Sequence, residues 1–363
     1  MKRNGKVDFL RFVFSIIVML FHIRGKYHIK ILYDGFITLT FFNRGNLGVE
    51  FFFVLSGFLM ARSVFHANQQ NRELSVARST TQFIKRKFIP LMPMNIAATG
   101  ILFIISCVLG NLSFIPALEK LLRAIPGLFF IQISGVASTT LNPYTWFLSA
   151  MLFSYLILYP LIYKNYSVFV RIIAPLVSLL LLGYLSHTYG SLGGAAVWTP
   201  ICRKALLRAI GEIALGAVCF EIYRLLSQRT FSKLAKMSVT IIEIACFAFA
   251  ILLCTIKRPV DLDIYVLGFM CVGLICAFTQ EAYGSRFFQH RFFGYLGKLS
   301  LSLFLVHRIA VRVVPHFVVS LPLRYQVLLT ILAALILAII FTALNERFFR
   351  YRKLRKAQQP CRN

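Results

Sequence analysis

Long apolar runs follow one another along the chain, separated by short polar connections. Each run has about the 17 to 25 residues that a helix needs to cross a bilayer. The runs lie at 7–23, 46–65, 88–109, 144–163, 168–187, 205–226, 238–256, 261–280, 296–317 and 326–346. This pattern predicts an all-α integral membrane protein that is a bundle of about ten transmembrane helices.

One further stretch, 118–135, is amphipathic. It begins with charged residues, Glu119 and Lys120, and Pro126 and Gly127 interrupt it. These features favour an interfacial or re-entrant segment over an eleventh crossing. We see no internal repeat or long soluble insertion, so the expected organisation is a transmembrane domain over 1–346 followed by a basic tail over 347–363.

The composition agrees with a membrane protein. Hydrophobic residues make up 58% of the chain and charged residues only 14%, against roughly a quarter charged in soluble domains. The 40 basic residues outnumber the 12 acidic ones, but they cluster between the apolar runs rather than in a separate domain. We therefore expect anionic membrane lipids as their neighbours and no nucleic acid partner.

The distribution of lysine and arginine also predicts the orientation. The connections on the side of the two termini hold about twice as many basic residues as the opposite connections. Positively charged connections stay in the cytoplasm, so both termini are expected there. The eight cysteines contain no Cys-x-x-Cys pair and sit mostly in apolar runs. This arrangement indicates packing rather than a metal site.

The first apolar run carries a polar stripe. Asp8, Arg11, Ser15 and His22 are spaced 3, 4 and 7 residues apart and share one face of a helix. Buried charge within a membrane helix usually faces the bundle interior, where it has a function. His22 is expected toward the external end and Arg11 toward the cytoplasmic end, about 16 Å apart at 1.5 Å per residue.

Several motifs together resemble the membrane acyltransferase 3 family, whose bacterial members acylate surface carbohydrates. The first run has the Arg-x10-His pattern, and 48–58 reads Gly-Val-x-x-Phe-Phe-x-x-Ser-Gly-Phe. Further matches are Phe-Ile-Lys-Arg-Lys-Phe-Ile-Pro at 83–90, Thr-Trp-Phe-Leu-Ser at 145–149, Gly211-Glu212 with Gly216, and a Gly-x-x-Ser signature ending in histidine at 297–307.

The resemblance implies an O-acyltransferase of the bacterial cytoplasmic membrane. Such an enzyme takes an acyl group, most simply acetyl, from acyl-CoA and places it on a hydroxyl of a cell-envelope polysaccharide or its lipid-linked precursor. Acyl-CoA is then a donor substrate, and no permanently bound cofactor is expected. We do not expect the fused external domain of longer family members here, so a second acyl-transfer step by such a domain would need a partner protein.

Acyl transfer to a hydroxyl needs a base and a donor to the developing oxyanion. Histidine is a natural base because its ordinary pKa is near 6.5, so His22 is the first catalytic candidate and His307 is the second, as a catalytic or acceptor-orienting residue. Arg11 either pairs with Asp8 or acts in catalysis, by gripping a donor phosphate or orienting a catalytic group. Lys85, Arg86 and Lys87 stand where the family often has two arginines. They either set the topology or bind the phosphates of coenzyme A.

The remaining candidates are expected to shape the substrate pocket. Glu50 needs a basic partner, either Arg44 or a residue of another span, and Arg208 is expected to pair with Glu212. Ser56 and Gly57 suit close helix packing better than a nucleophile. Two arginines near the external end of the ninth run either reach toward the headgroups or bind an anionic acceptor. The pocket candidates are Glu50, Ser56, Gly57, Trp146, Ser300, Arg308 and Arg312.

A rival class of function is a multispan exporter of polysaccharide or of an anionic solute. A basic bundle with buried charge fits this class as well. Transporters commonly contain repeated halves with interrupted helices in corresponding places, and this sequence contains no such repetition. The sequence therefore favours the enzyme.

Overall fold

The computed structural model describes residues 3–29, 41–70, 74–136, 140–256 and 261–358, and within these ranges the chain forms helices and no strand. The helices are α1 (Gly5–Tyr27), α2 (Gly48–Gln69), α3 (Val76–Phe88), α4 (Met92–Leu109), α5 (Phe114–Leu128), α6 (Trp146–Lys164), α7 (Tyr166–Val168), α8 (Ala174–Tyr189), α9 (Lys204–Leu226), α10 (Lys233–Thr255), α11 (Asp263–Thr279), α12 (Arg291–Phe317) and α13 (Leu323–Gln358). The predicted tail falls partly outside this description, at 359–363.

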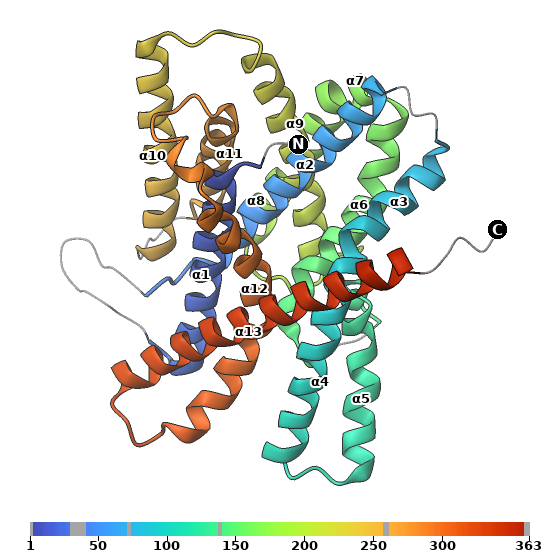
Figure 1. Ribbon diagram of the computed structural model, residues 1–363, viewed down its shortest axis with the longest axis vertical. Coiled ribbons are helices and arrows are strands. Elements are labelled where there is room, and N and C mark those ends of the chain that lie inside the picture. Colours follow the sequence, from blue (N-terminus) through green and yellow to red (C-terminus); the bar gives the residue numbers. More distant parts are fainter. Residues whose placement is uncertain (1–2, 30–40, 71–73, 137–139, 257–260, 359–363) are drawn as a thin grey trace.

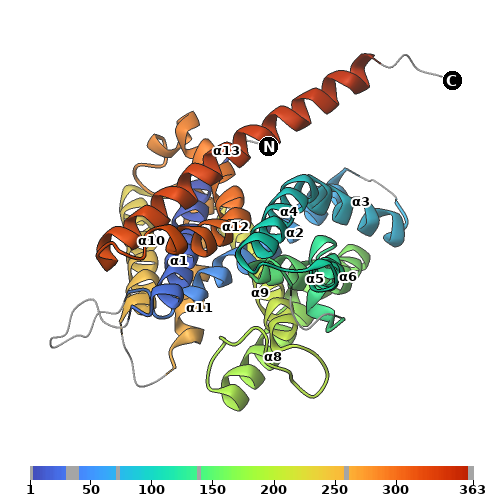
Figure 2. The ribbon, with the colours of Figure 1, turned by 90° about the horizontal axis from the view of Figure 1, so that it is seen from below.

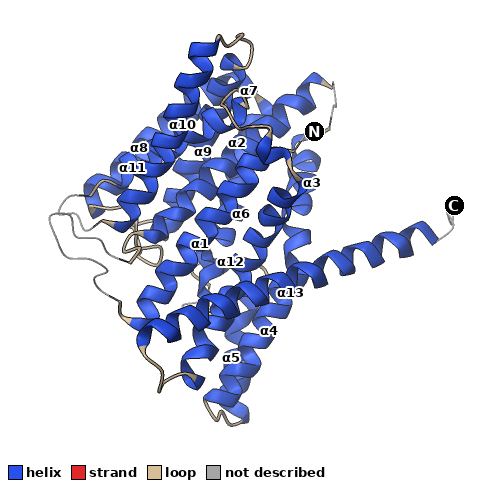
Figure 3. Ribbon diagram, turned by 60° about the vertical axis from the view of Figure 1, so that its left-hand side comes forward, coloured by secondary structure: helices blue, strands red, loops and turns tan. Residues whose placement is uncertain are grey.

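The helices form two groups (Figures 1 and 2). Helices α1, α10, α11, α12 and α13 lie on one side, α3 to α6 lie on the other, and α2 and α9 lie between them. Helices α4 and α5 form a hairpin at one end of the bundle. The C-terminal half of α13 projects away from the other helices, as Figure 3 shows.

Two glycines allow α2 and α9 to touch through their backbones. A Cβ atom at Gly57 would lie 1.9 Å from the carbonyl oxygen of Ile213, and one at Gly216 would lie 2.1 Å from that of Val54. Only glycine fits such a crossing, which is a common device between membrane helices. This close contact fixes the position of α9 against α2, and with it the position of the charged side chains that the two helices share.

Six helical segments of the described residues are long and apolar enough to cross a membrane. They are Gly45–Gln69, Val76–Leu109, Pro143–Lys164, Tyr166–Tyr189, Lys233–Thr255 and Leu323–Arg352. The other four predicted runs also fall on helices, α1, α9, α11 and α12, which are shorter or more polar. The all-helical membrane fold is thus established, and the number of about ten crossings stays a prediction.

The amphipathic stretch forms α5 and the short helical turn Gln132–Ser134. At 15 residues, α5 is shorter than the roughly 20 residues of a typical crossing. Its apolar side is exposed at Phe114, Ile115 and Leu122, while Glu119 and Arg123 form an ion pair on its surface. This distribution is typical of a helix that lies in the membrane interface.

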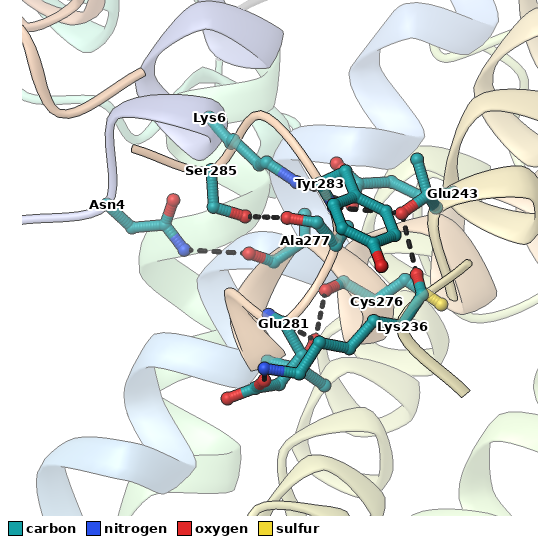
Figure 4. A network of polar contacts seen from close by, with 12 residues as sticks. Asn4, Lys6, Lys236, Glu243, Cys276, Ala277, Glu281, Tyr283 and Ser285 are labelled. Carbon is teal, nitrogen blue, oxygen red and sulfur yellow. Dashed lines mark hydrogen bonds and ion pairs between the residues drawn. The ribbon is translucent and has the colours of Figure 1, made fainter. Parts of the chain in front are cut away.

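Polar contacts hold the N-terminal end of α1 against α10 and α11 (Figure 4). Lys6 Nζ donates to Glu243 of α10 at 2.8 Å, and Asn4 Nδ2 donates to the Ala277 carbonyl of α11 at 3.0 Å. Nearby, Lys236 pairs with Glu281 at 2.9 Å. These contacts fix the start of the helix that carries the polar stripe.

Candidate active site

The structure brings the two candidate histidines together. Nδ1 of His22, from α1, and Nε2 of His307, from α12, are 3.1 Å apart, and Nδ1 of His307 lies 2.8 Å from the Leu303 carbonyl oxygen. A carbonyl only accepts, so Nδ1 of neutral His307 carries its proton and Nε2 is an acceptor. Nδ1 of His22 must then donate to it. Nε2 of His22 is left as the ring nitrogen that can take a proton.

Tyr144 covers both imidazole rings. It belongs to the short helical turn Pro143–Thr145 that precedes α6. Its ring stacks on His22 with centroids 3.6 Å apart and on His307 at 4.9 Å. Arg308 donates from Nη1 to the Tyr144 hydroxyl at 2.9 Å. Arg308 therefore supports the histidine pair through Tyr144. His307 itself is almost fully buried, at 1% exposure.

His22 opens onto a cavity of about 700 Å³. The end of α1, the start of α2 and the segment between α8 and α9 form its walls, and Trp146 also lines it. Four cations also line it: Arg24, Arg44, Lys204 and Arg208. The proton-accepting histidine thus stands at the edge of a space large enough for a sugar-sized ligand.

A buried charge cluster lies in the wall of this cavity. Arg208 donates from Nε to Glu50 at 3.0 Å and to Glu212 at 3.0 Å, and its Nη2 atom also pairs with Glu50. All three side chains are at most 1% exposed. The expected Arg208–Glu212 pair is therefore present, and Arg208 is also the partner that Glu50 requires. Its guanidinium lies 5.7 Å from the Trp146 ring centre.

Arg11 lies in a second cavity, of about 690 Å³, lined by residues of α1, α4, α12 and α13. Its Nη1 atom is 3.4 Å from Asp8, which also pairs with Arg3 at 2.6 Å. The polar stripe therefore divides between two cavities, with Arg11 in one and His22 in the other. Ser15, between them, donates to the Phe12 carbonyl of its own helix at 2.8 Å.

The basic cluster before α4 approaches Arg11 through one member. Lys87 is partly buried and interacts electrostatically with Arg11, while Lys85 and Arg86 are exposed. The structure thus joins one lysine of the cluster to the Arg11 region.

Apart from Arg308, which reaches the histidine pair through Tyr144, the other pocket candidates do not line the His22 cavity. Ser56 lies beside Met151, with its oxygen 3.1 Å from the sulfur, and Gly57 lies in the contact with α9. Ser300 donates to the Arg11 carbonyl at 2.9 Å and so joins α12 to α1. Arg308 and Arg312 line a third cavity of about 410 Å³ beneath α5.

Tyr144 was not predicted as a support for the histidines, and Arg24, Arg44 and Lys204 were not predicted as lining residues. Tyr144 directly precedes the Thr145-Trp146 motif, and Arg24 follows His22 by two residues. Proximity to a motif could therefore have marked both. Arg44 was considered only as a partner for Glu50, and no local signal connects Lys204 with His22.

Comparison with known proteins gives one match. A family model described as an acyltransferase domain matches residues 4–344, nearly the whole chain. No curated protein and no solved structure matches the chain.

Proposed function

The chain belongs to the acyltransferase 3 family, and we propose that this membrane acyltransferase moves an acyl group, most simply acetyl, from acyl-CoA to a hydroxyl of a cell-envelope polysaccharide or its lipid-linked precursor. The single observation that carries this proposal is the hydrogen-bonded pair of His22 and His307 at the edge of a cavity. The pair leaves Nε2 of His22 ready to accept a proton.

The proposed reaction is a direct transfer at His22. Nε2 of His22 accepts the proton of the sugar hydroxyl while the oxygen attacks the thioester carbonyl. A carbon–oxygen bond forms, the carbon–sulfur bond breaks, and the proton passes from His22 to the leaving thiolate. His307 accepts from Nδ1 of His22 at 3.1 Å and so positions the ring, while Tyr144 keeps the two imidazoles stacked.

The two cavities support separate binding of the two substrates. Arg11 and Lys298 are cations of the cavity on the side of the N-terminus, where the bacterial cytoplasm supplies acyl-CoA in this proposal. His22 lies eleven residues further along α1, or about 16 Å, beside the cavity assigned to the glycan. The thioester end of acyl-CoA must therefore extend along α1 toward His22. No resident cofactor takes part.

Purified protein in lipid nanodiscs tests the proposal. Incubation with acetyl-CoA and glycan from a host strain that lacks the protein should release free coenzyme A and give an acetylated glycan, as mass spectrometry detects. The release should depend on the glycan. If the glycan instead enters liposomes without consumption of acetyl-CoA, the protein is an exporter and not an acyltransferase.

The orientation is tested separately. With both termini in the cytoplasm, a reporter that is active only in the cytoplasm should give signal when fused after the C-terminal residue and also within the connection between α2 and α3. A silent C-terminal fusion with an active internal one would mean an odd number of crossings between the two points.

A further inference from the structure

The cavity beside His22 has a strongly positive lining. Arg24, Arg44, Lys204 and Arg208 line it, and among the described residues no carboxylate does. Arg208 is balanced by Glu50 and Glu212 behind the wall. The other three cations therefore give this space its positive charge.

The contacts of these three cations leave hydrogen-bond donors available to a ligand. Lys204 donates to the Ser191 carbonyl at 2.5 Å and lies 4.7 Å from the Tyr189 ring centre, both neutral partners. Arg44 is 3.9 Å from Asp263, beyond hydrogen-bond length. Nε of Arg24 is buried and makes no hydrogen bond within the described part of the chain. A buried donor without a partner is costly, and a ligand oxygen would satisfy it.

The segment between α8 and α9 keeps its backbone close to these cations. A Cβ atom at Gly193 would lie 3.4 Å from Asn46 and 3.8 Å from Arg44, and Gly194 has a φ of +82° that favours glycine. The absence of a side chain at Gly193 leaves the cavity open next to Arg44.

We propose that this cavity binds an acidic sugar. The acceptor carries an anionic oxygen group, a carboxylate or a phosphate, near the hydroxyl that is acylated, and Arg24, Arg44 and Lys204 hold that group. The inference rests on the proposed function for the role of the site. Arginine donors match carboxylate and phosphate oxygens. A neutral sugar would offer no charged oxygen to these cations, and Nε of Arg24 would keep only an uncharged acceptor in a partly desolvated space.

Tryptophan fluorescence can report binding without any acyl transfer. The chain has two tryptophans, and Trp146 lines the cavity. The Trp198→Phe variant therefore leaves Trp146 as the sole reporter. The ligands are oligosaccharide fragments of the host surface polysaccharide, intact, with carboxyl groups reduced to alcohols, or with phosphates removed by hydrofluoric acid.

One of the two treatments should weaken binding at least tenfold, and its identity distinguishes a carboxylate from a phosphate. Arg24→Gln, Arg44→Gln and Lys204→Gln should each weaken binding of the intact fragment roughly tenfold, as loss of a charge-assisted hydrogen bond does. Arg24→Lys should retain part of the affinity. Arg324→Gln, an exposed residue at the start of α13, is the matched control and should bind normally. Each variant is compared only after its size-exclusion profile matches that of the parent.

Two results would overturn the inference. One is equal affinity for the intact and both neutralised fragments, and the other is a raised KM for acetyl-CoA with unchanged glycan binding, because the cavity would then hold the donor phosphates. A different result would refute the proposed function. If the glycan binds in a charge-dependent way but receives no acetyl group, the acyl transfer is refuted and the anionic site is not. Equal transfer to intact and neutralised glycan refutes the anionic site alone.

Discussion

The two ends of α1 differ in how closely the cations around them are paired with carboxylates. At the N-terminal end, Lys6 pairs with Glu243 at 2.8 Å, and Arg3 and Arg11 both contact Asp8. At the other end, Arg24 lines the His22 cavity together with Arg44 and Lys204, and no carboxylate of the described residues shares that lining. The N-terminal end of α1 therefore lies among closely paired cations, whereas at its other end Arg24 joins cations from two other segments around a cavity.

This difference separates structural charge from functional charge. A pair such as Lys6–Glu243, with side chains 6% and 12% exposed, holds α1 to α10, as Figure 4 shows. Its removal should change stability. Beside His22, Nε of Arg24 has no partner in the described part of the chain, and Arg44 lies 3.9 Å from its carboxylate, beyond hydrogen-bond length, so removal of these cations should change ligand binding. The four predictions below test this division, beginning with the largest expected effect.

His22→Ala should abolish glycan acylation while the protein still accumulates in the membrane. Loss of a general base typically costs on the order of 10² to 10⁴ in rate, and Nε2 of His22 is the base in the proposed reaction. The measurement is acetyl transfer by purified protein, normalised to the amount of folded protein. Phe21→Ala, the neighbouring ring in the same cavity, is the control for lost volume. Near-normal transfer by His22→Ala would remove histidine catalysis.

Arg208→Met should strongly destabilise the fold. It leaves Glu50 and Glu212 buried together without a cation, and breaking such a cluster costs about 3 to 5 kcal/mol. Glu50→Gln should be milder because the Arg208–Glu212 pair at 3.0 Å remains. Thermal unfolding in detergent measures both variants. If the Arg208→Met variant were as stable as the parent, the charges of this cluster would not serve stability.

The positions of the helices were predicted better than the contacts between their side chains. All ten apolar runs fall on helices because length and hydropathy are local properties. The polar stripe was assigned to one face, yet Arg11 and His22 line different cavities, because each cavity is completed by residues of other helices that the spacing within α1 does not reveal. The free-energy cost of a buried carboxylate was enough to predict that Glu50 has a basic partner. That this partner is Arg208 depends on how α2 and α9 cross at Gly57 and Gly216.

The cations of the ninth run illustrate the same limit. Arg308 and Arg312 were expected either to reach toward the headgroups or to bind an anionic acceptor, and Arg308 does reach the histidine pair through Tyr144. Both arginines, however, line the cavity beneath α5. The segment between α8 and α9, which completes the His22 cavity, lies far away in sequence. Spacing within one helix could not reveal which cavity each side chain enters.

Lys6→Met should lower stability by about 1.5 to 3 kcal/mol, the range for a lost hydrogen bond to a charged group. The substitution leaves Glu243 of α10 without the cation that pairs with it from the start of α1. The double variant Lys6→Met with Glu243→Leu should recover much of the loss, because both buried charges are then gone. Thermal unfolding gives the stability, and acetyl transfer per folded molecule should stay unchanged. A loss of transfer in the stable double variant would contradict a purely structural role.

Arg11→Gln should give the smallest effect, a rise in KM for acyl-CoA on the order of two- to fivefold, as for a partly exposed ion pair. The side chain is 32% exposed and already contacts Asp8 at 3.4 Å, so solvent and this carboxylate both weaken its hold on a phosphate. The KM for the glycan should not change, since the glycan occupies the other cavity. Arg11→Lys should restore binding only in part, because an ammonium lacks the planar fork of a guanidinium. Steady-state kinetics with each substrate varied in turn decides the matter. A change in the KM for the glycan alone would place the acceptor at the paired end of α1 and reverse the assignment of the two cavities.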